Sequence, residues 1–344
     1  MNRPSMAITA LTILSTAGCS NREPPTACDR ACLIEIADGY LAAIAAHEPG
    51  ATSLSTDVAF VENITAMKPG EGLWASAAGS SRRFRINVPD PDQGTIGFMT
   101  VIERRTAERV APALLAARLK IENRTITEAE HVIADVPREA DPTRLEAPRP
   151  GLTALVPERE RMSRQTLAAI ASSYYDALVA SDGSRAPFAE DCEREENGMI
   201  AAGPGLPPAP FDSVDVQGRR PPPVARDCAG QMSSRRFAYI DRIDNRRVFA
   251  VDPVQGLAMG LSHFRQSMTR GPQLMIAADG SRVMWEEKRE PYDLPAAHIF
   301  KIANGRIHEV EAIGIFVPYG APTGWKRSAT SGVSSAIPDR SDLR

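Results

Sequence analysis

The sequence has no surplus of positive charge and no long apolar run beyond its first residues. Its 344 residues contain 40 lysines and arginines against 43 aspartates and glutamates, a formal net charge of −3. Because proteins bind the nucleic-acid backbone through clustered basic side chains, this balance argues against a nucleic-acid partner. No later run is long and apolar enough to span a bilayer, so we expect membrane contact only through an N-terminal lipid anchor.

The signature motifs of several large enzyme classes are also missing. The sequence contains no H-E-x-x-H zinc motif, no phosphate-binding P-loop, no G-x-S-x-G nucleophile elbow and no G-x-G-x-x-G turn after an expected strand. The five histidines and five cysteines form no cluster with the spacing of a metal site. We therefore predict neither a bound metal nor a cofactor.

The N-terminus has the layout of an export signal. One arginine is followed by a short apolar run over residues 6–14 and then by small residues. The segment "TAGCS" resembles a bacterial lipobox, in which Cys19 is acylated and begins the mature chain, although Thr16 stands where leucine is usual. We predict a signal peptide with a lipobox over residues 1–19, with a plain secretory signal as the alternative. Both place the protein in the bacterial cell envelope, in the periplasm or at the outer membrane.

The cysteines fit an oxidising compartment. With Cys19 lipidated four remain, and four exported thiols are typical of two disulfides with three possible pairings. We favour Cys28–Cys32, whose helical i,i+4 spacing brings the two Cα atoms roughly 6 Å apart, together with Cys192–Cys228. A zinc site with four cysteine ligands is the alternative, but the sequence lacks the tight C-x-x-C spacing of such sites.

Two segments share one helical pattern of apolar side chains. The first contains Leu33, Ile36, Tyr40 and Ile44, and the second contains Leu167, Ile170, Tyr174 and Leu178. Intervals of three and four residues indicate an amphipathic helix with one buried face. The two sets are offset by 134 residues (167 − 33), and the dipeptide Glu-Asn recurs at the same offset, at 62–63 and 196–197.

Further short stretches recur in the same order along the chain. They are "GEGLW" (70–74) with "GPGLP" (203–207), "SSRRF" (80–84 and 233–237), "DPDQG" (90–94) with "DPVQG" (252–256), and "RTITEAEHV" (124–132) with "GRIHEVEAI" (305–313). Because the matches are collinear and their offset mostly grows, we infer a duplicated domain whose second copy was enlarged by insertions.

The repeat divides the chain into segments. We place the first domain at 29–136, a Pro-rich linker without an apolar period at 137–161, and the second domain with its insertions at 162–325. The Ser-rich tail at 326–344 lacks an apolar pattern, so we expect it to be disordered.

Each copy begins with a helix and continues mostly as strands. The stretch 246–264 reads as two strands joined at 252–256, and 298–316 as two more joined at 303–305, where Asn-Gly is a strong hairpin signal. The Asp-Gly of "AADGSRVMW" suggests one further hairpin turn. A helix packed on a curved antiparallel sheet is an α+β arrangement.

By these features each copy resembles a nuclear transport factor 2-like (SnoaL-like) domain, and 29–325 resembles a family of exported proteins that carry such domains in tandem. The resemblance is carried by the tyrosine of the first helix, the Glu-Asn pair, "FKIANGRIHEVEA" and the ending "PYGAPTGW" (318–325). The first copy departs at Arg124, where the second has Gly305. The resemblance implies two cone-shaped α+β domains, each with N-terminal helices on a curved sheet and a pocket between them. It implies no reaction, because relatives include cyclases, isomerases, dehydratases and non-enzymatic binders.

Two glutamates late in the second copy are the first candidates for chemistry. On a regular strand Ile307, Glu309, Glu311 and Ile313 share one face. If that face lines the cone, desolvation raises a carboxylate pKa and makes the group a candidate general acid or base, with His263 as a partner. The alternatives are a solvated sheet rim for the glutamates and a core or rim position for the histidine.

Further carboxylates and amides are candidate ligand contacts. They are Glu128 and Glu130, which repeat the glutamate pair in the first copy, and Glu62, Asn63, Glu196 and Asn197 after the first helix of each copy. The Glu-Asn pairs would meet a polar ligand at the mouth of a pocket. Their structural alternative is a turn or cap asparagine beside a glutamate that accepts from backbone donors.

We therefore expect an exported, lipid-anchored protein that binds a small molecule or an envelope protein through a pocket of this kind. One alternative is an enzyme of lyase, isomerase or hydrolase type that uses a pocket glutamate, with or without His263, for proton transfer. A second alternative is a non-catalytic scaffold. An open pocket that holds Glu309 or Glu311 would support the first two, and apolar side chains that fill both cones would support the scaffold.

Overall fold

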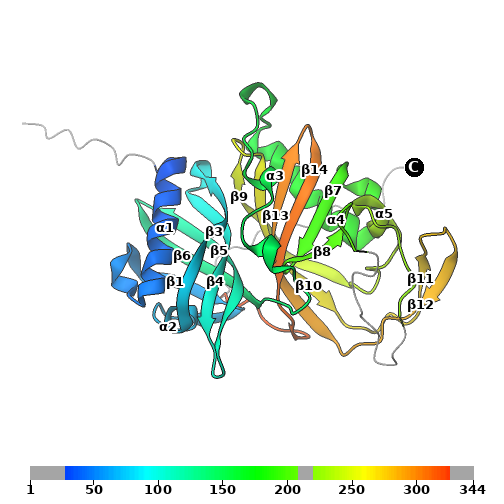
Figure 1. The fold of residues 1–344 in the computed structure, drawn as a ribbon, viewed down its shortest axis with the longest axis horizontal. Helices are drawn as coiled ribbons and strands as arrows, with labels where there is room; N and C mark the ends of the chain where they lie inside the picture. Colours follow the sequence, from blue (N-terminus) through cyan, green and yellow to red (C-terminus); the bar gives the residue numbers. More distant parts are fainter. Residues whose placement is uncertain (1–27, 208–219, 326–344) are drawn as a thin grey trace, which may run out of the picture.

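The computed structural model describes residues 28–207 and 220–325 (Figure 1). The predicted signal peptide with Cys19 and the predicted disordered tail lie outside the described residues. The first half of the chain (28–136) contains α1 (Arg30–Ala46), η1 (Pro49–Ala51), β1 (Leu54–Glu62), β2 (Thr65–Met67), α2 (Leu73–Ser76), β3 (Ala77–Asp90), η2 (Pro91–Gln93), β4 (Thr95–Arg105), β5 (Val110–Glu122) and β6 (Thr125–Asp135). In the described ranges no helix combines the length and the apolar character that crossing a membrane requires.

The second half (162–325) repeats this order with additions. It contains α4 (Arg164–Ala180), η5 (Gly183–Arg185), β7 (Phe188–Glu196), β8 (Met199–Ala202), α5 (Cys228–Ser233), β9 (Arg242–Asp252), β10 (Leu257–Gln266), β11 (Gln273–Ile276), β12 (Arg282–Trp285), β13 (Tyr292–Ala303), β14 (Arg306–Gly314) and β15 (Val317–Pro318). The linker between the halves contains η3 (Pro142–Leu145), α3 (Pro150–Thr153) and η4 (Glu158–Glu160).

The two halves have sheets with the same strand order. The order is β2-β1-β6-β5-β4-β3 in the first sheet and β8-β7-β14-β13-β10-β9 in the second, where β15 also pairs with β13. Each sheet contains a parallel pair, in which Phe60 lies opposite Ala129 (β1 and β6) and Arg194 opposite Val310 (β7 and β14). These positions differ by 134 (194 − 60) and 181 (310 − 129), the offsets of the sequence repeat. The architecture is mixed α+β, as predicted.

The two predicted amphipathic helices are confirmed. The helix α1 begins where the side chain of Asp29 accepts from the backbone N–H of Cys32, and α4 begins where Ser163 accepts from that of Thr166. Each helix packs on one face of its own sheet. The buried predicted residues are Leu33, Tyr40 and Ile44 in α1 and Leu167, Tyr174 and Leu178 in α4.

The predicted hairpins are confirmed as well. Asn304 and Gly305 join β13 to β14 with φ values of 51° and 73°, the left-handed conformations that favour Asn-Gly in a two-residue turn. The strands β11 and β12 pair on either side of the expected Asp-Gly turn. One repeat match does not correspond in structure: "SSRRF" lies on β3 at 80–84, but at 233–237 it ends α5 and forms the turn that follows.

Both favoured disulfides are present. Cys28 is bonded to Cys32 at the start of α1, and Cys192 on β7 is bonded to Cys228 on α5. Disulfides persist in oxidising surroundings, so the pair of bonds fits a location outside the cytoplasm.

The sheets pack on each other through the faces opposite to the helices. This inter-sheet core includes Phe84, Ile86, Met99 and Leu114 from the first sheet and Leu257, Met259, Leu261 and Ile299 from the second. The linker adds buried Leu145 and Leu152, so it is packed into the core rather than being a free spacer. Figure 1 shows the linker with α3 in the middle of the view and the β11–β12 hairpin at the end opposite α1.

The two aspartates of the repeated Asp-Pro motif form contacts between the halves. Asp90, only 1% exposed, accepts from Nε of Arg164 at 2.7 Å and from the backbone N–H of Val251 at 3.0 Å. Asp252, also 1% exposed, accepts from Nε and Nη2 of Arg30 at 3.1 and 2.9 Å. The arginines begin α4 and α1 and occupy equivalent positions of the repeat. The contact is therefore reciprocal, as in a two-fold symmetric interface.

A bulge alters the strand face predicted for the glutamates. The register of β14 against both β13 and β7 shifts between Ile307 and Glu309, and β6 has the equivalent bulge. An extra residue interrupts the regular alternation of side chains. Ile307 and Val310 therefore face α4, whereas Ile313 lies in the inter-sheet core. The expectation that Ile307 shares a face with Glu309 and Glu311 is wrong for this reason.

Substitution of Asp90 tests the reciprocal contact. Asp90→Asn should lower the free energy of unfolding by about 2–3 kcal/mol, because it leaves the charge of Arg164 without its partner in the interface. Equilibrium urea unfolding measures the change. Asp92→Asn, in the same turn but exposed, is the control and should cost less than about 0.5 kcal/mol. Equal losses in the two variants would contradict the role given to Asp90.

Candidate functional site

A cavity of about 380 Å³ lies between the second sheet, α4 and α5. This volume is within the range of small-molecule sites. The apolar part of its wall includes Tyr174 and Leu178 of α4, Phe237 from the turn after α5, Phe264 of β10 and Leu294 of β13. The cavity therefore lies between helix and sheet, where the resemblance to nuclear transport factor 2-like domains implies a pocket.

A buried guanidinium forms one polar part of the wall. Arg194 on β7 is 1% exposed; its Nη1 donates to Oε1 of Gln231 at 2.6 Å, and its Nη2 donates to the carboxylate of Glu196. The guanidinium carbon lies 5.4 Å from the ring centre of Phe237. An unpaired buried charge is costly, so these partners are needed to keep Arg194 inside the wall. Its Nε has no hydrogen-bond partner in the described part of the chain.

A buried histidine forms a second polar part. His298 on β13 is fully enclosed, and burial together with the nearby charge of Arg194 lowers its pKa to about 3. The imidazole is therefore neutral at physiological pH. Its Nδ1 lies 3.3 Å from the hydroxyl of Tyr175, and its ring stacks on Phe300 at 6.0 Å between centres. A neutral ring offers one donor and one acceptor nitrogen.

A disulfide positions the helix that closes one end of the cavity. Cys192, two residues before Arg194, is bonded to Cys228, the first residue of α5. Gln231, three residues further along α5, donates to the carbonyl oxygen of Ala201 at 2.7 Å and accepts from Arg194. The amide of Gln231 thereby joins α5 to both β7 and β8.

The equivalent space in the first half is filled by its own side chains. Trp74 of α2 is 1% exposed and lies edge-on to Tyr40, with 5.3 Å between ring centres. His131 bridges the hydroxyl of Tyr40 at 3.0 Å and the carboxylate of Glu62 at 3.2 Å. Glu62 also accepts from the backbone N–H of Leu73 at 3.0 Å, which is the structural role weighed for this residue.

The strand registers show how the two halves differ at the cavity. Phe60 takes the position of Arg194 (60 + 134), and Ala117 takes that of His298 (117 + 181). Arg194 and His298 are therefore particular to the second half.

The two asparagines of the Glu-Asn pairs hold strand ends together. Asn63 donates to the carbonyl oxygen of Ile133 at 3.1 Å and accepts from its N–H at 2.8 Å. Asn197 makes the same two contacts with Gly314, at 3.0 and 2.9 Å. These contacts support the structural role that was the alternative to ligand binding for the two asparagines. In the second half Asn197 and Glu196 also line the cavity, so the pair combines a structural role with a position in the cavity wall.

Glu309 and Glu311 lie outside this cavity, in a carboxylate cluster beside the linker. The cluster consists of Glu193, Glu195, Glu309 and Glu311. Nε of Arg149 lies 3.2 Å from Glu309 and its Nη2 3.3 Å from Glu311, and Arg144 pairs with the two glutamates of β7. Burial, aided by repulsion from Glu195, raises the pKa of Glu311 to about 8, and burial also raises the pKa of Glu309.

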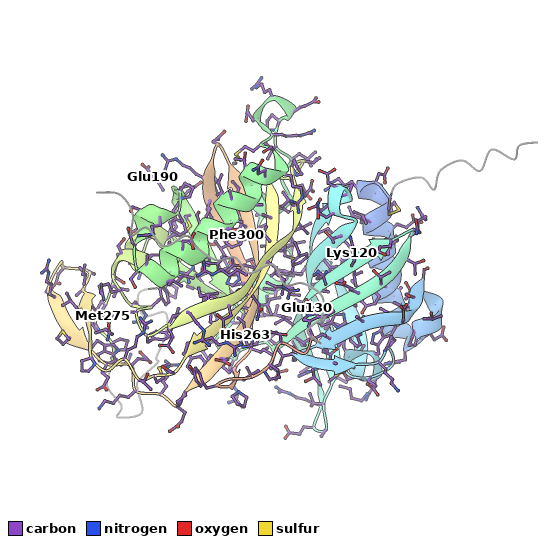
Figure 2. All side chains as sticks on the ribbon, turned by 180° about the vertical axis from the view of Figure 1, so that it is seen from behind. Lys120, Glu130, Glu190, His263, Met275 and Phe300 are labelled. Atoms are coloured by element: carbon purple, nitrogen blue, oxygen red, sulfur yellow. A yellow bond between two sulfur atoms is a disulfide. The ribbon has the colours of Figure 1, made fainter. Side chains whose placement is uncertain are left out.

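The remaining predicted residues lie where the halves meet. Glu130 accepts from Nη1 and Nη2 of Arg247 at 3.0 and 2.7 Å, and Glu128 pairs with an arginine of β5. Figure 2 shows Glu130 and His263 close to the contact between the two sheets, where they line a cleft of about 30 Å³. His263 also lies 3.5 Å from the carboxylate of Asp293. Of these contacts, the pair of Glu130 with Arg247 joins the two halves, and none of the three predicted residues lines the cavity.

The structure does not assemble the predicted acid–base pair. His263 lies opposite Pro295 on β13, whereas Glu311 lies opposite Ile299 and Glu309 opposite Lys301 on the same strand. Four residues of a strand span about 13 Å, which is too far for a hydrogen bond. Among the described residues, no group of three or more His, Cys, Asp or Glu side chains is arranged to hold a metal ion.

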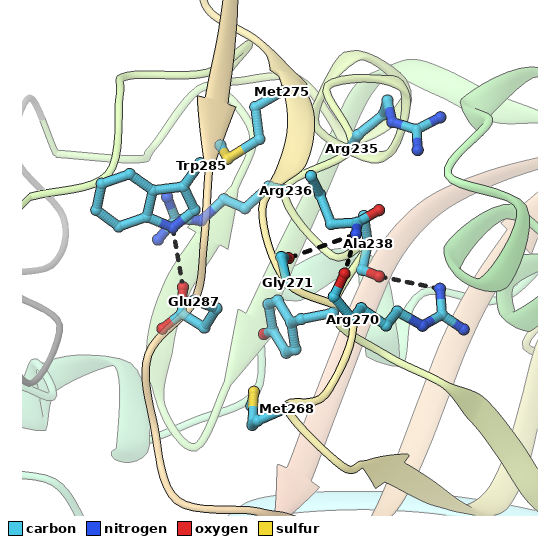
Figure 3. A pocket seen from close by; sticks show the side chains of 11 residues that line it. Arg235, Arg236, Ala238, Met268, Arg270, Gly271, Met275, Trp285 and Glu287 are labelled. Carbon is cyan, nitrogen blue, oxygen red and sulfur yellow. Dashed lines mark hydrogen bonds between the residues drawn. The ribbon is translucent and has the colours of Figure 1, made fainter.

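A much smaller pocket adjoins the cavity (Figure 3). It measures about 20 Å³, enough for one water molecule, and shares Arg236 and Tyr239 with the cavity wall. Nε1 of Trp285 donates to Glu287 at 3.3 Å across it. The close-up also shows that Arg235 and Arg236 point in different directions from one turn.

Sequence reasoning missed Arg194, His298 and Gln231. A signal was available for the first: the repeat aligns Arg194 with Phe60, and an arginine in place of a core aromatic residue marks a changed environment. His298 and Gln231 had no comparable local signal, because each depends on the way that β13 and α5 meet β7.

The carboxylate cluster predicts a stability that depends on pH. The raised pKa of Glu311 means that the folded chain keeps a proton that the unfolded chain loses near its usual value of 4.5. The protonated carboxyl therefore adds to the free energy of unfolding. The added stability is fully present below pH 4.5 and is lost as the pH rises through about 8, with a slope of at most about 1.4 kcal/mol per pH unit. Urea unfolding from pH 5 to 9 should show this slope in the wild type and a smaller one in Glu311→Gln. Exposed Glu158→Gln is the control, and an unchanged slope in Glu311→Gln would contradict the assignment.

The second half of the chain resembles one described protein family. A family described as a domain of unknown function (DUF8021) matches residues 160–314, the part of the chain from α4 to β14 that holds the cavity. Two solved structures of candidate polyketide cyclases, from Silicibacter sp. TM1040 and Xanthomonas campestris pv. campestris, are each 17% identical to this chain. The matches cover 45% and 44% of this chain and 92% and 90% of theirs, with TM-scores of 0.27 and 0.25. No curated protein matches the chain.

Proposed function

We propose that this chain consists of two tandem nuclear transport factor 2-like domains and that the second binds a small organic molecule in its cavity. One observation carries the proposal. The cavity of about 380 Å³ is lined by aromatic rings and contains buried polar groups, whereas Trp74 packs the equivalent space in the first half. The shared strand order and the matching offsets support the duplication.

Binding is favoured over acid–base catalysis by the groups in the cavity. His298, with a pKa of about 3, is a weak base at neutral pH, whereas an efficient general base has a pKa near the working pH. Glu196 is paired with Arg194. The catalytic candidates Glu309 and Glu311 are engaged by the linker instead. The polar groups of the cavity are better suited to holding a ligand than to moving its protons.

The first domain acts in this proposal as the scaffold. Its own cone is filled, which is the feature expected of a non-catalytic scaffold. Its sheet covers the back of β10 and β13, the strands that supply Phe264 and His298 to the cavity. A rigid back wall holds these side chains in position without the ligand.

We also propose export and anchoring by lipidated Cys19. The two disulfides support an oxidising compartment, and the apolar run followed by "TAGCS" supports the lipobox. Mass spectrometry of the mature N-terminus should find acylated Cys19. An unmodified first residue other than Cys19 would contradict anchoring and favour the plain secretory signal. An envelope protein is the alternative occupant of the cavity.

Blocking the cavity tests the binding proposal. Met199 on β8 lines the cavity, so Met199→Trp should abolish binding of aromatic fragments found by ligand-observed NMR against the wild type. Thr65→Trp, at the equivalent exposed position of the first half (65 + 134), is the matched control and should keep every hit. Circular dichroism and urea midpoints establish that both variants are folded. Failure to find any fragment that Met199→Trp displaces would overturn the proposal.

A further inference from the structure

We infer that the ligand is an organic anion, with a carboxylate on an aromatic or alicyclic body. The inference rests on the proposed binding function of the cavity and deepens it by naming the class of ligand.

The wall carries more positive than negative charge. Arg194, Arg236 and Arg289 line the cavity, against one lining carboxylate, Glu196. Glu196 pairs with Arg194, and Arg289 pairs with Glu287, which lies outside the cavity wall. Among the described residues three guanidiniums thus face two carboxylates (3 − 2 = 1), which leaves one positive charge unpaired.

The remaining charge belongs to Arg236. This side chain is half-buried in the turn after α5 and has no ion-pair partner in the described ranges. A planar guanidinium matches a carboxylate with two parallel hydrogen bonds, which gives both strength and orientation. A ligand carboxylate beside Arg236 would neutralise the wall, whereas a cationic ligand would add to its excess charge.

Neutral polar groups extend this recognition. Gln266 is 2% exposed and lines the cavity, and its Oε1 has no hydrogen-bond partner within the described residues. Native proteins rarely leave a buried carbonyl oxygen unpaired, and a hydroxyl on the ligand would supply the missing donor. Uncharged His298 adds another group able to hydrogen-bond without adding charge.

The apolar part of the wall favours a ring over a bare inorganic anion. Tyr174, Phe237 and Phe264 present aromatic surfaces, and Tyr292 with Phe316 forms a ring pair 5.1 Å apart on the same wall. Aromatic rings prefer stacked or edge-on partners, which a flat ligand body supplies. A volume of about 380 Å³ accommodates such a body together with its anionic group.

Three probes with one ring system test the inference. They are 2-naphthoate, neutral 2-naphthamide and cationic 2-naphthylmethylammonium, titrated calorimetrically into the full mature chain. The naphthoate should bind at least 10-fold more tightly than the amide, a difference of about 1.4 kcal/mol, and the cation should not bind measurably. Added salt should weaken the naphthoate more than the amide.

Two arginine variants locate the anion. Arg194→Gln is the obvious change, but it removes the partner of Glu196 inside a buried wall and can prevent folding. Arg236→Gln avoids this problem, and it should lower naphthoate affinity about 10-fold while leaving the amide within about 2-fold. Arg235→Gln is the matched control, because Arg235 points away from Arg236 and does not line the cavity.

The outcomes separate this inference from the function on which it rests. Equal or tighter binding of the amide, with both ligands blocked by Met199→Trp, would overturn the anion and keep the cavity as a binding site. A naphthoate preference that survives Arg236→Gln would also overturn it. No binding of any probe would overturn the anion inference alone where Met199→Trp still displaces other fragments, and the absence of any such fragment would overturn both.

Discussion

The reciprocal pairing of Asp90 with Arg164 and of Asp252 with Arg30 fixes how the two sheets face each other. The apolar inter-sheet core provides most of the burial, but apolar contact alone is non-directional. The ion pairs specify the alignment, because each joins the end of a strand in one half to the start of a helix in the other. With this contact made, the remaining face of each sheet is covered by its own helix, and the cavity must lie beneath α4.

The sequence predicts where the helices and turns lie better than it predicts which side chains share one face of a strand. Helical periodicity located α1 and α4, and Asn304-Gly305 located the β13–β14 turn, because both signals are local. The bulge before Glu309 is not visible in the apolar pattern, yet a shift of one residue moves every following side chain to the other face. Glu309 and Glu311 therefore contact Arg149 of the linker and do not line the cavity.

The polar side chains of the cavity wall could not be predicted for a related reason. Arg194, Gln231 and His298 come from β7, α5 and β13, and their sequence neighbours do not indicate that they meet. The disulfide between Cys192 and Cys228 is the link that the sequence does supply, since it fastens α5 beside β7 and brings Gln231 to Arg194. The favoured pairing of Cys192 with Cys228 thus predicted that these two segments meet, although nothing in the sequence marked their meeting point as a site.

In the first half buried Trp74 packs against Tyr40, whose equivalent in the second half (40 + 134) is Tyr174 of the cavity wall. An unfilled cavity and a buried guanidinium both lower stability relative to packed apolar side chains. The second half carries both features at one place, and its Arg194 and His298 stand where the first half has Phe60 and Ala117. Departures from good packing that concentrate at one place are typical of functional sites. The difference between the two halves therefore supports the proposed ligand in the second half more strongly than any single residue does.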